Sequence, residues 1–548
     1  MKKKRTKKED EKERKIINVK GRAKHKQKKK ARHKIKQIKR HMGKGKRTSV
    51  HHYRKHSKPI KRKIKKHHKK HYKSKIKHRK IHRNIKQKNL STEMLSLNAE
   101  DLKKSSHIFR SYDVRGIYNK DLNEEIMYRI GNTFAAKTKK NIVVGIDVRT
   151  SSPALCNSFI SGCIAAGKKV YFIGLVPLGA GMLYALQKKF DYAFITASHL
   201  PKEWNGVKFF HHDGIGYLQK ENQSIKNVFL KGNLSRKSGG KAIKENNKKT
   251  LSNYIDFFKI KAKKKMKIIL DPGNGCASLA ARKMFEKADF DVISIYDYID
   301  GNFPNRDPEP TSENLTTLKE MIIAEKADFG FAYDGDGDRF ILVDNKARVS
   351  SPEQASYIIL QDLLNEKKGP VVANIECTRL VDDIASRFSR KVIRVPVGHT
   401  FLVQTVLKEK ACFGFEASGH FMMPSLIKTD DSLAVSLHLA VQLSKQYETV
   451  SDLLDKIPSY PFARINFECS DQNKFNVIEN LKEELKEKHK GITSIDGIRI
   501  EFSYGWILIR ASNTSPAIRL SIEAQNDYYL DKMKNEFSEI LEGAIKEV

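Results

Sequence analysis

The chain of 548 residues has a formal net charge of +44, but this charge is distributed unevenly. Residues 1–90 hold 42 Lys and Arg against 4 Asp and Glu, together with 11 of the 19 histidines, whereas the remainder holds 64 basic against 58 acidic side chains. A segment of that composition cannot bury enough apolar surface to offset the loss of chain entropy, so we expect residues 1–104 to form a disordered basic tail. The remainder is long enough for about three domains of typical size.

Cysteine usage and hydropathy exclude several classes of protein. The six cysteines stand without a CxxC pair, which argues against a disulfide framework and a zinc site. No run approaches the roughly 18 consecutive apolar residues of a membrane span, and the basic N-terminus is not followed by an apolar secretory core. We therefore expect a cytoplasmic protein without a transmembrane segment.

The basic tail predicts an attraction to polyanions, because lysines and arginines release counterions from a phosphate backbone when they bind it. Tyr53 and Tyr72 offer little aromatic surface for stacking on bases. Nucleic acid, an anionic membrane surface and acidic polysaccharide all remain open as non-specific partners of residues 1–90. The alternative is a solvated tail without a dedicated partner, since charge runs alone carry little information.

From residue 141 the chain contains three successive groups of short apolar runs. They are NIVVGID, KKVYFIGLVP and DYAFITASH, then MKIILDPGNG, DVISIYD and ADFGFAYDGDGDR, then PVVANIECTRL, KVIRVPVGH and ACFGFEASGH. Such β-rich runs, separated by stretches with helical spacing, predict parallel strands joined by helical crossovers. Ligands of these sheets bind beyond the carboxyl ends of the strands, so the turn that ends each group is a candidate site.

The last 90 residues have a different pattern. FARINFECS and GIRIEFSYGWILIRAS flank the charged helical stretch FNVIENLKEELKEKH, and a further helical stretch closes the chain. This arrangement predicts a smaller α+β domain with an antiparallel sheet.

TASHLPKEWNGVKFF, at 196–210, raises the question of whether Ser198 is a nucleophile or a serine in a turn. No GxSxG elbow occurs in the chain, so Ser198 lacks the strained turn of an α/β-hydrolase. GCIAAGKK is not a phosphate-binding P-loop either, because Lys169 stands where Ser or Thr must hold magnesium.

In DGDGDR, Asp334, Asp336 and Asp338 alternate with glycines directly after an apolar run. Carboxylates that converge at a strand end repel one another unless a hard cation lies between them, so the spacing favours Mg²⁺ with room for waters and a phosphate. A solvated acidic turn is the alternative. An EF-hand is excluded, because Arg339 occupies the obligatory glycine position and Asn345 that of the bidentate glutamate.

RASNTSPAIR, at 510–519, places two arginines around small polar side chains in a turn. Guanidinium groups bind phosphate bidentately and turn N–H groups complete an anion nest, and an exposed turn is the alternative for the motif taken alone.

GFEASGH, at 414–420, places Glu416, Ser418 and His420 on one glycine-flanked loop. A carboxylate and a hydroxyl there suit vicinal sugar hydroxyls, and a capped turn is the equal alternative.

Taken together and in order, FRSYDVRG at 109, TASHLPKEWNGVK, DGDGDR, GFEASGH and RASNTSPAIR resemble the α-D-phosphohexomutase family, most closely its phosphomannomutase/phosphoglucomutase branch. The resemblance extends over residues 105–548. It implies an α/β fold of three mixed α/β domains of similar topology plus a smaller C-terminal α+β domain around a central cleft. The implied domain ranges are 105–245 with the phosphoserine loop, 246–347 with the metal loop, 348–458 with the sugar loop and 459–548 with the phosphate loop.

The resemblance also implies the chemistry and the residues that perform it. Ser198 carries the phosphoryl group, hexose 1-phosphate and hexose 6-phosphate are interconverted through a hexose 1,6-bisphosphate that also acts as activator, and mannose and glucose are the favoured sugars. Further catalytic residues are Lys208, Arg339, His199 and Arg115, and Mg²⁺ is bound by Ser198, Asp334, Asp336 and Asp338. The hexose phosphate is bound by Tyr112, His399, Glu416, Ser418, His420, Arg510, Ser512, Asn513, Thr514 and Arg519.

Three positions depart from the family pattern. Leu200 replaces a usual asparagine and is expected to weaken the rigidity of the serine loop, Trp204 replaces a common tyrosine, and Val403 replaces a frequent lysine and is expected to weaken the grip on a substrate phosphate. Two alternatives stay open: a phosphoglucosamine mutase, and a noncatalytic sugar-phosphate-binding protein tethered to polyanions by its tail.

Overall fold

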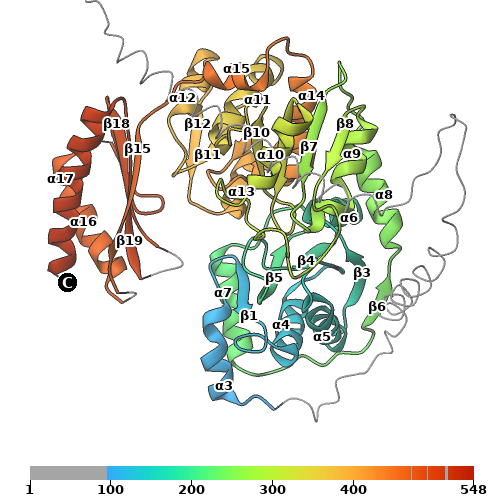
Figure 1. Ribbon diagram of the computed structural model, residues 1–548. Coiled ribbons are helices and arrows are strands. Elements are labelled where there is room, and N and C mark those ends of the chain that lie inside the picture. Colours follow the sequence, from blue (N-terminus) through green and yellow to red (C-terminus); the bar gives the residue numbers. More distant parts are fainter. Residues whose placement is uncertain (1–95, 471, 490, 513–515, 548) are drawn as a thin grey trace, which may run out of the picture. The chain divides into compact units, whose positions relative to one another are not determined.

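The computed structural model describes residues 96–470, 472–489, 491–512 and 516–547. The chain divides into two units, Met1–Leu97 and Asn98–Val548, and all helices and strands described below belong to the second (Figure 1). The predicted basic tail lies outside the described residues except for its last part. There the expected boundary at residue 104 is wrong, because Ala99–Lys104 form helix α3, capped by the Asn98 side chain, which accepts the N–H groups of Glu100 and Asp101.

The first sheet has six strands in the order β1-β5-β4-β2-β3-β6. The pairs β2–β3, β2–β4 and β3–β6 are parallel, whereas β4–β5 and β1–β5 are antiparallel. The strands are β1 (Asp113–Ile117), β2 (Ile142–Ile146), β3 (Lys169–Leu175), β4 (Asp191–Ile195), β5 (Trp204–Phe210) and β6 (Lys241–Lys244).

Helices cover both faces of this sheet. Successive side chains of a strand point to opposite faces, so neighbouring residues pack against helices on different sides. Phe209 stacks on Phe134 of α4, with ring centroids 4.7 Å apart, whereas Phe210 stacks on Tyr192 in the cluster that contains α6. The helical elements of this part are η2 (Ser105–Ile108), α4 (Glu124–Lys137), α5 (Ser152–Ala165), α6 (Leu178–Lys188), α7 (Gln219–Leu230) and α8 (Asn247–Phe257).

The second and third sheets have four strands each, in the orders β10-β9-β7-β8 and β12-β11-β13-β14. The strands are β7 (Lys267–Asp271), β8 (Asp291–Ser294), β9 (Phe329–Tyr333), β10 (Phe340–Asp344), β11 (Val371–Asn374), β12 (Val392–Val395), β13 (Phe413–Phe415) and β14 (Phe421–Met422). The helical elements are η3 (Cys276–Leu279), α9 (Ala281–Lys287), α10 (Thr316–Glu325), α11 (Pro352–Glu366), α12 (Leu380–Arg387), α13 (His399–Lys408), α14 (Ser432–Leu443) and α15 (Val450–Asp455).

One four-stranded pattern recurs in the three sheets and confirms the predicted mixed α/β domains. In each, three parallel strands are followed along the chain by a fourth that runs antiparallel beside the third: β5 beside β4, β10 beside β9 and β14 beside β13. The sequence analysis found the three parallel strands of each set but not the fourth. The turn between third and fourth strand carries Ser198 in the first sheet, the three aspartates in the second and Glu416 to His420 in the third.

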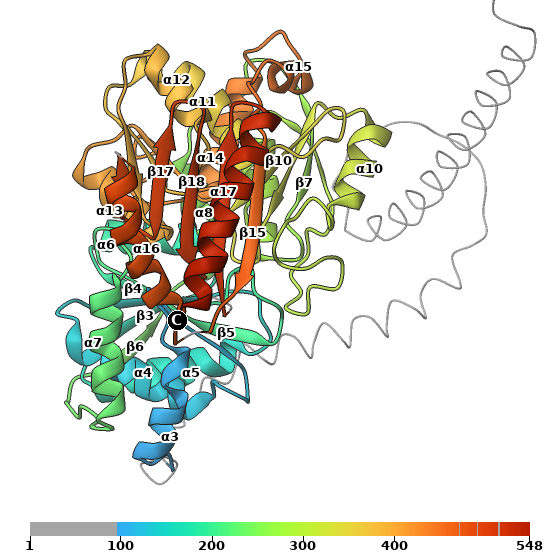
Figure 2. The same cartoon turned by 90° about the vertical axis from the view of Figure 1, so that its left-hand side faces the viewer.

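The C-terminal sheet is antiparallel, with the order β15-β19-β18-β17-β16, and confirms the predicted α+β domain. Its elements are β15 (Phe462–Glu468), α16 (Lys474–Lys488), β16 (Ile492–Thr493), β17 (Ile498–Phe502), β18 (Gly505–Ala511), β19 (Ala517–Ala524) and α17 (Asp527–Lys546). Helices α16 and α17 lie on one face, in front of the strands in Figure 2.

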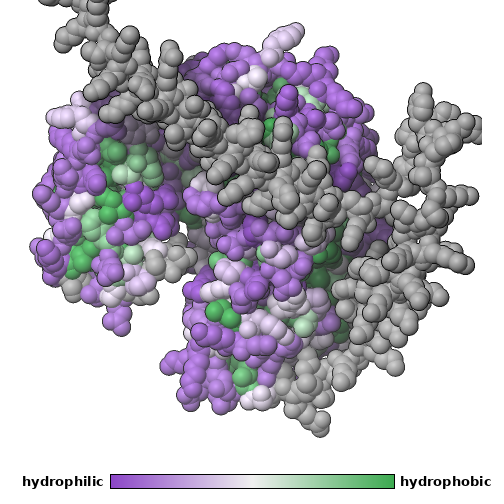
Figure 3. Space-filling view, in the orientation of Figure 1, coloured by the Kyte–Doolittle hydropathy of each residue, from purple (hydrophilic) through white to green (hydrophobic). Residues whose placement is uncertain are grey.

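The buried apolar side chains form separate clusters that follow this division. One continuous cluster of buried side chains joins α6, α8 and the second and third sheets, whereas Ile507, Ile509 and Ile518 belong to a cluster confined to the C-terminal sheet and its two helices. Among the described residues no helix is long and apolar enough to cross a bilayer. On the face shown in Figure 3, hydrophilic residues dominate and the apolar side chains form separate patches.

Candidate functional site

Ser198 lies in the turn between β4 and β5 with an unusual backbone. Its φ of 52° is in the left-handed region, which costs a non-glycine residue free energy and persists only where surrounding contacts impose it. The N–H of Ser198 donates to Thr196 Oγ1 at 2.8 Å, and Thr196 Oγ1 in turn donates to Asp336 at 3.1 Å. The serine is 1% exposed. The turn is therefore tied to the acidic loop of the next domain.

Arg149, which the sequence analysis did not single out, holds the serine loop. Its buried guanidinium pairs with Asp147 at 3.0 Å and donates to the carbonyl oxygens of Ser198 and Leu200 at 2.8 and 2.6 Å. The same group also donates to the carbonyls of Pro201 and Trp204. The loop is thus fixed through its backbone, and its conformation does not depend on an amide side chain at position 200.

The acidic loop folds around Asp334. One carboxylate oxygen of Asp334 accepts the N–H groups of Gly337, Asp338 and Arg339 at 2.9, 3.0 and 3.2 Å, and the other accepts Ser198 Oγ at 3.0 Å. A Cβ atom at Gly335 would lie 2.5 Å from the carbonyl oxygen of Ser198, so this approach requires glycine. The predicted nucleophile and the predicted metal loop are thereby in direct contact.

The three aspartates are buried within reach of one cation. Carboxylate oxygens of Asp334, Asp336 and Asp338 lie within 4.8 Å of one another, and one oxygen each of Asp336 and Asp338 is buried without a hydrogen bond. Lys208 Nζ lies 3.1 Å from Asp336 and 2.6 Å from Asp338. Oxygen donors with unsatisfied lone pairs suit a hard divalent cation, so this donor set fits Mg²⁺.

The charges in this cluster shift the pKa values of its members. Burial and the neighbouring Asp338 and Asp336 raise the pKa of Asp334. Burial opposes ionisation of Asp338, but Lys208 and His420 outweigh it and hold its pKa well below the usual range. Asp336 and Asp338 raise the pKa of Lys208 against its burial.

His199 lies beside the serine, and Arg339 lies beside His420. Arg339 Nε lies 3.4 Å from His420 Nε2, and His199 Nδ1 lies 3.4 Å from Ser198 Oγ. The charge of Arg339, followed by burial, lowers the pKa of His199, so its ring is neutral near pH 7. Arg115 pairs with Asp113 at 2.8 Å and also donates to the carbonyl of Ala197, one residue before the serine.

His420 connects the acidic loop to the predicted sugar loop. It lies 3.3 Å from Asp338 and 3.1 Å from Glu416, and Asp338 and Glu416 raise its pKa to about 9 against burial and Arg339. Glu416 also accepts the N–H of Gly398 at 2.7 Å, whereas Ser418 is exposed.

His399 and Tyr112 lie at the start of α13. His399 pairs with the buried Asp430 at 3.3 Å, and its ring stacks on that of His420 at 5.6 Å between centroids. The Tyr112 hydroxyl donates to the Val397 carbonyl at 2.6 Å, and its ring lies where a Cβ at Gly398 would stand. Gly398 has a φ of 140°, which favours glycine.

Two of the predicted phosphate-binding residues gather around a carboxylate that the sequence analysis missed. Arg510 and Arg519 lie 3.7 and 4.0 Å from Glu376, which follows β11 in the third domain. Arg464 of β15 lies 3.9 Å from the same carboxylate. Ser512 is buried and pairs through its N–H with Ala517, whereas Asn513 and Thr514 lie outside the described residues.

A short path of hydrogen bonds joins this arginine cluster (Arg464, Arg510 and Arg519) to Tyr112. Val397, whose carbonyl accepts the Tyr112 hydroxyl, donates its N–H to Asp496 at 3.1 Å, and Asp496 accepts Arg510 at 3.2 Å. The structure thus links the arginine cluster to Tyr112.

The expectation for Val403 is wrong. Val403 is 1% exposed and packs with Val372 and Leu402 in an apolar cluster beneath α13. A lysine there would bury its ammonium group instead of reaching a phosphate.

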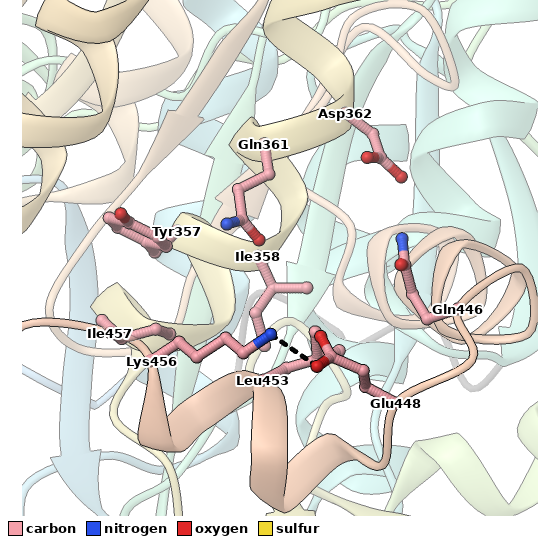
Figure 4. A pocket seen from close by; sticks show the side chains of 9 residues that line it. All are labelled: Tyr357, Ile358, Gln361, Asp362, Gln446, Glu448, Leu453, Lys456 and Ile457. Carbon is pink, nitrogen blue, oxygen red and sulfur yellow. Dashed lines mark hydrogen bonds and ion pairs between the residues drawn. The ribbon is translucent and has the colours of Figure 1, made fainter.

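Two cavities in the described part of the chain lie apart from these residues. One of about 280 Å³ is formed by α11, α15 and the segment before α15, where Lys456 pairs with Glu448 (Figure 4). The other, of about 630 Å³, is lined by Leu183, Phe257 and Ile427 among others. Neither is lined by a predicted site residue.

Comparisons with known families cover most of the chain after residue 105. The families described as phosphoglucomutase/phosphomannomutase alpha/beta/alpha domains I, II and III match residues 106–236, 248–347 and 351–460, and the corresponding C-terminal domain matches residues 465–540.

Individual relatives carry two different names. A phosphomannomutase/phosphoglucomutase of Pseudomonas syringae pv. tomato is 32% identical over 443 residues, covering 78% of this chain and 94% of the relative. A probable phosphoglucosamine mutase of Methanosarcina acetivorans is 30% identical over 443 residues, covering 80% of this chain and 100% of the relative. The crystal structure of a phosphoglucomutase/phosphomannomutase family protein of Burkholderia thailandensis superposes with a TM-score of 0.74 at 26% identity, covering 80% of this chain and 98% of that one.

Proposed function

Because this chain belongs to the α-D-phosphohexomutase family, we propose that it interconverts hexose 1-phosphates and hexose 6-phosphates through a phosphoserine at Ser198. The observation that carries this proposal is the contact between Ser198 Oγ and Asp334 inside the buried acidic loop. A serine held in a left-handed conformation against the buried Asp334 carboxylate is an unfavourable arrangement for a purely structural turn.

Ser198 transfers its phosphoryl group to one end of the sugar phosphate and later recovers the phosphate from the other end. Arg339 and Arg115 neutralise charge on the transferring group, since phosphoryl transfer depends mostly on positioning and electrostatic stabilisation. We assign Lys208 and His199 to proton transfer, because their nitrogens border the carboxylates and Ser198 Oγ.

Asp334, Asp336 and Asp338 would hold Mg²⁺ together with the phosphoserine. The bound cation would supply charge neutralisation at the phosphoryl oxygens. Lys208 lies against two of these carboxylates and compensates part of their charge.

The remote phosphate of the substrate is bound by Arg510 and Arg519, and the sugar between the two ends is contacted by His399, Ser418 and Tyr112. A hexose 1,6-bisphosphate intermediate then turns over within the site, so either phosphate is bound by the same arginines. The same bisphosphate, supplied in trace amounts, would prime Ser198 as activator.

For the sugar we propose mannose and glucose phosphates. The opening segment FRSYDVRG supports this branch, and the 32% identical relative named phosphomannomutase/phosphoglucomutase agrees with it. Glucosamine phosphate is the second candidate, which the relatives named probable phosphoglucosamine mutase favour.

A coupled mutase assay tests the proposal. With Mg²⁺ and a trace of glucose 1,6-bisphosphate, the full chain is supplied with mannose 1-phosphate, glucose 1-phosphate or glucosamine 1-phosphate. We expect turnover of the first two, at least a 10³-fold loss in Ser198→Ala, and ³²P transfer from labelled bisphosphate to the wild-type protein but not to Ser198→Ala. Ser158→Ala, a buried serine of α5, serves as control and should retain activity.

Faster turnover of glucosamine 1-phosphate would move the assignment to the second candidate. A folded wild type that turns over none of the three sugars and takes up no label would favour a sugar-phosphate-binding protein without catalysis.

A further inference from the structure

Glu376 is an acidic residue at the centre of a basic surface. It directly follows the Ile375 turn after β11, is partly buried with a side chain that is 11% exposed, and lies 3.7 to 4.0 Å from Arg464, Arg510 and Arg519. These arginines come from three different strands of the C-terminal sheet, β15, β18 and β19. A carboxylate of one domain is therefore the shared counter-ion of three guanidinium groups of another.

The strand register explains why these arginines converge. Arg510 pairs with Arg519 across β18 and β19, and Arg464 pairs with Ser521 across β15 and β19, so the three side chains share one face of the sheet. Helices α16 and α17 cover the opposite face, where Ile518, Leu520 and Ile522 point. Like charges on one face repel, and burial together with Arg464 lowers the pKa of Arg519. The face therefore favours a bound anion.

Glu376 satisfies this preference for an anion only in part. Its Oε1 atom and Arg510 Nε are both buried without a hydrogen bond although they lie 3.7 Å apart. Nearby ion pairs are tighter: Arg510 Nη1 lies 3.2 Å from Asp496, and Arg499 Nε lies 2.7 Å from Glu501. Glu376 thus compensates the arginines by charge without forming the short bidentate contacts that arginine makes with a well-placed anion.

We propose that Glu376 is a positioning residue that acts as the resident anion of the arginine cluster, is displaced when a substrate phosphate binds there, and returns when that phosphate leaves. This inference rests on the proposed function, because it concerns the site of the remote phosphate. A phosphate dianion offers three acceptor oxygens to the three guanidinium groups, whereas the Glu376 carboxylate makes no hydrogen bond with them through Oε1.

Exchange of Glu376 with phosphate suits a reaction in which the hexose 1,6-bisphosphate intermediate must reorient within the site. When a phosphate leaves the three clustered arginines, of which Arg510 is buried, and no other anion replaces it, the guanidinium groups repel one another, and this slows its departure. If the Glu376 carboxylate pairs with the arginines again, it lowers the barrier to phosphate departure and also lowers the affinity for phosphate. Removing its charge should therefore tighten phosphate binding while slowing the reorientation and release steps.

Glu376→Gln tests this, with Glu376→Asp as the conservative variant that keeps the charge. Glu479→Gln is the matched control, because it removes the same charge from the exposed face of α16, where Glu479 pairs with Lys482 at 3.1 Å. In the full chain we expect Glu376→Gln to lower the KM for glucose 1-phosphate about tenfold and kcat severalfold. Titration calorimetry with inorganic phosphate should show a Kd about tenfold lower than wild type, with Glu376→Asp close to wild type.

Unchanged or raised KM and phosphate Kd in a folded Glu376→Gln would overturn the inference, as would an equal effect in Glu479→Gln. Loss of catalysis in Glu376→Gln together with weaker phosphate binding would mean that Glu376 contacts the substrate itself. The calorimetric result does not need turnover, so it separates this inference from the mutase assignment. If wild type proves inactive on every sugar but the variant binds phosphate more tightly, only the function has failed.

Discussion

The reaction centre and the arginine cluster are charge-reversed versions of one arrangement. At the first, the cation Lys208 lies among carboxylates, and at the second, the anion Glu376 lies among guanidinium groups. The difference lies in the quality of the contacts. Lys208 Nζ is 2.6 Å from Asp338, whereas no arginine of the cluster is closer than 3.7 Å to Glu376.

The contact distances indicate that Lys208 is a structural ion, whereas Glu376 is an exchangeable one. A buried charge with short hydrogen bonds is costly to remove, whereas a loosely compensated one can yield to a better ligand. We therefore expect substitutions at the centre to affect folding and kcat, and substitutions at the arginine cluster to affect mainly ligand affinity.

The largest effect is expected for Lys208→Met. The variant leaves Asp336 and Asp338 buried without their cation, which should destabilise the metal-free protein by about 3 kcal/mol. Because bound Mg²⁺ restores positive charge among the carboxylates, saturating Mg²⁺ should reduce the difference in free energy of unfolding between the variant and wild type. Thermal unfolding with EDTA or with Mg²⁺ measures this, and the exposed Lys202→Met is the control. A destabilisation that Mg²⁺ leaves unchanged would contradict the role of Lys208 as the counter-ion of these carboxylates.

A smaller effect is expected at the arginine cluster. Arg464→Met should raise the KM for hexose phosphates about fivefold, or about 1 kcal/mol, because Arg464 is one of three cations there and is partly exposed. kcat should change less than twofold. Steady-state kinetics measure both constants, with Arg282→Met on the surface of α9 as control. A drop in kcat with unchanged KM would place Arg464 in the chemistry instead of in binding.

A pH effect distinguishes the two regions, since guanidinium groups do not titrate in the neutral range. Asp431 caps α14 next to the acidic loop, and burial raises its pKa from 3.8 to about 7, against the hydrogen bonds from Ala434 N–H and Tyr254. Between these values the folded state binds a proton that the unfolded state has released, so stability falls as pH rises from about 4 to 7.

Asp431→Asn keeps a capping oxygen and removes the titration. Relative to this variant, wild type should lose on the order of 3 kcal/mol between pH 4 and pH 8. Chemical denaturation at several pH values measures the difference. A constant difference across this range would show that Asp431 is ionised in the folded protein at pH 4.

The smallest effect on either region is expected from deletion of residues 1–97. A chain that begins at Asn98, the N-cap of α3, should keep kcat and KM within about twofold of wild type. Only the full chain should be retained on a nucleic acid column, with retention lost as salt rises. Equal retention of both proteins would remove the predicted polyanion binding by residues 1–90.

Local sequence determined the strands and the loops that follow them. DYAFITASH, ADFGFAYDGDGDR and ACFGFEASGH each end a buried strand in a polar turn, and the structure places β4, β9 and β13 there. The order of β-rich and helical stretches in the last 90 residues likewise predicted the antiparallel C-terminal sheet. Each motif alone left the roles of Ser198 and the three aspartates open, and the resemblance of the five motifs in order pointed to them.

Contacts between distant segments were decided only by the tertiary structure. Arg149 stands about 50 residues before the carbonyls it holds, and Glu376 and Arg464 come from separate domains, so no local period points to any of them. From the sequence, Val403 is a position where a family lysine is missing, whereas the structure places it in an apolar cluster. Backbone propensity and the periodicity of apolar residues act over a few residues, so they determine the helices, strands and loops. Ion pairs form between surfaces that meet only after folding, so the counter-ion of each charged residue is determined by the tertiary structure.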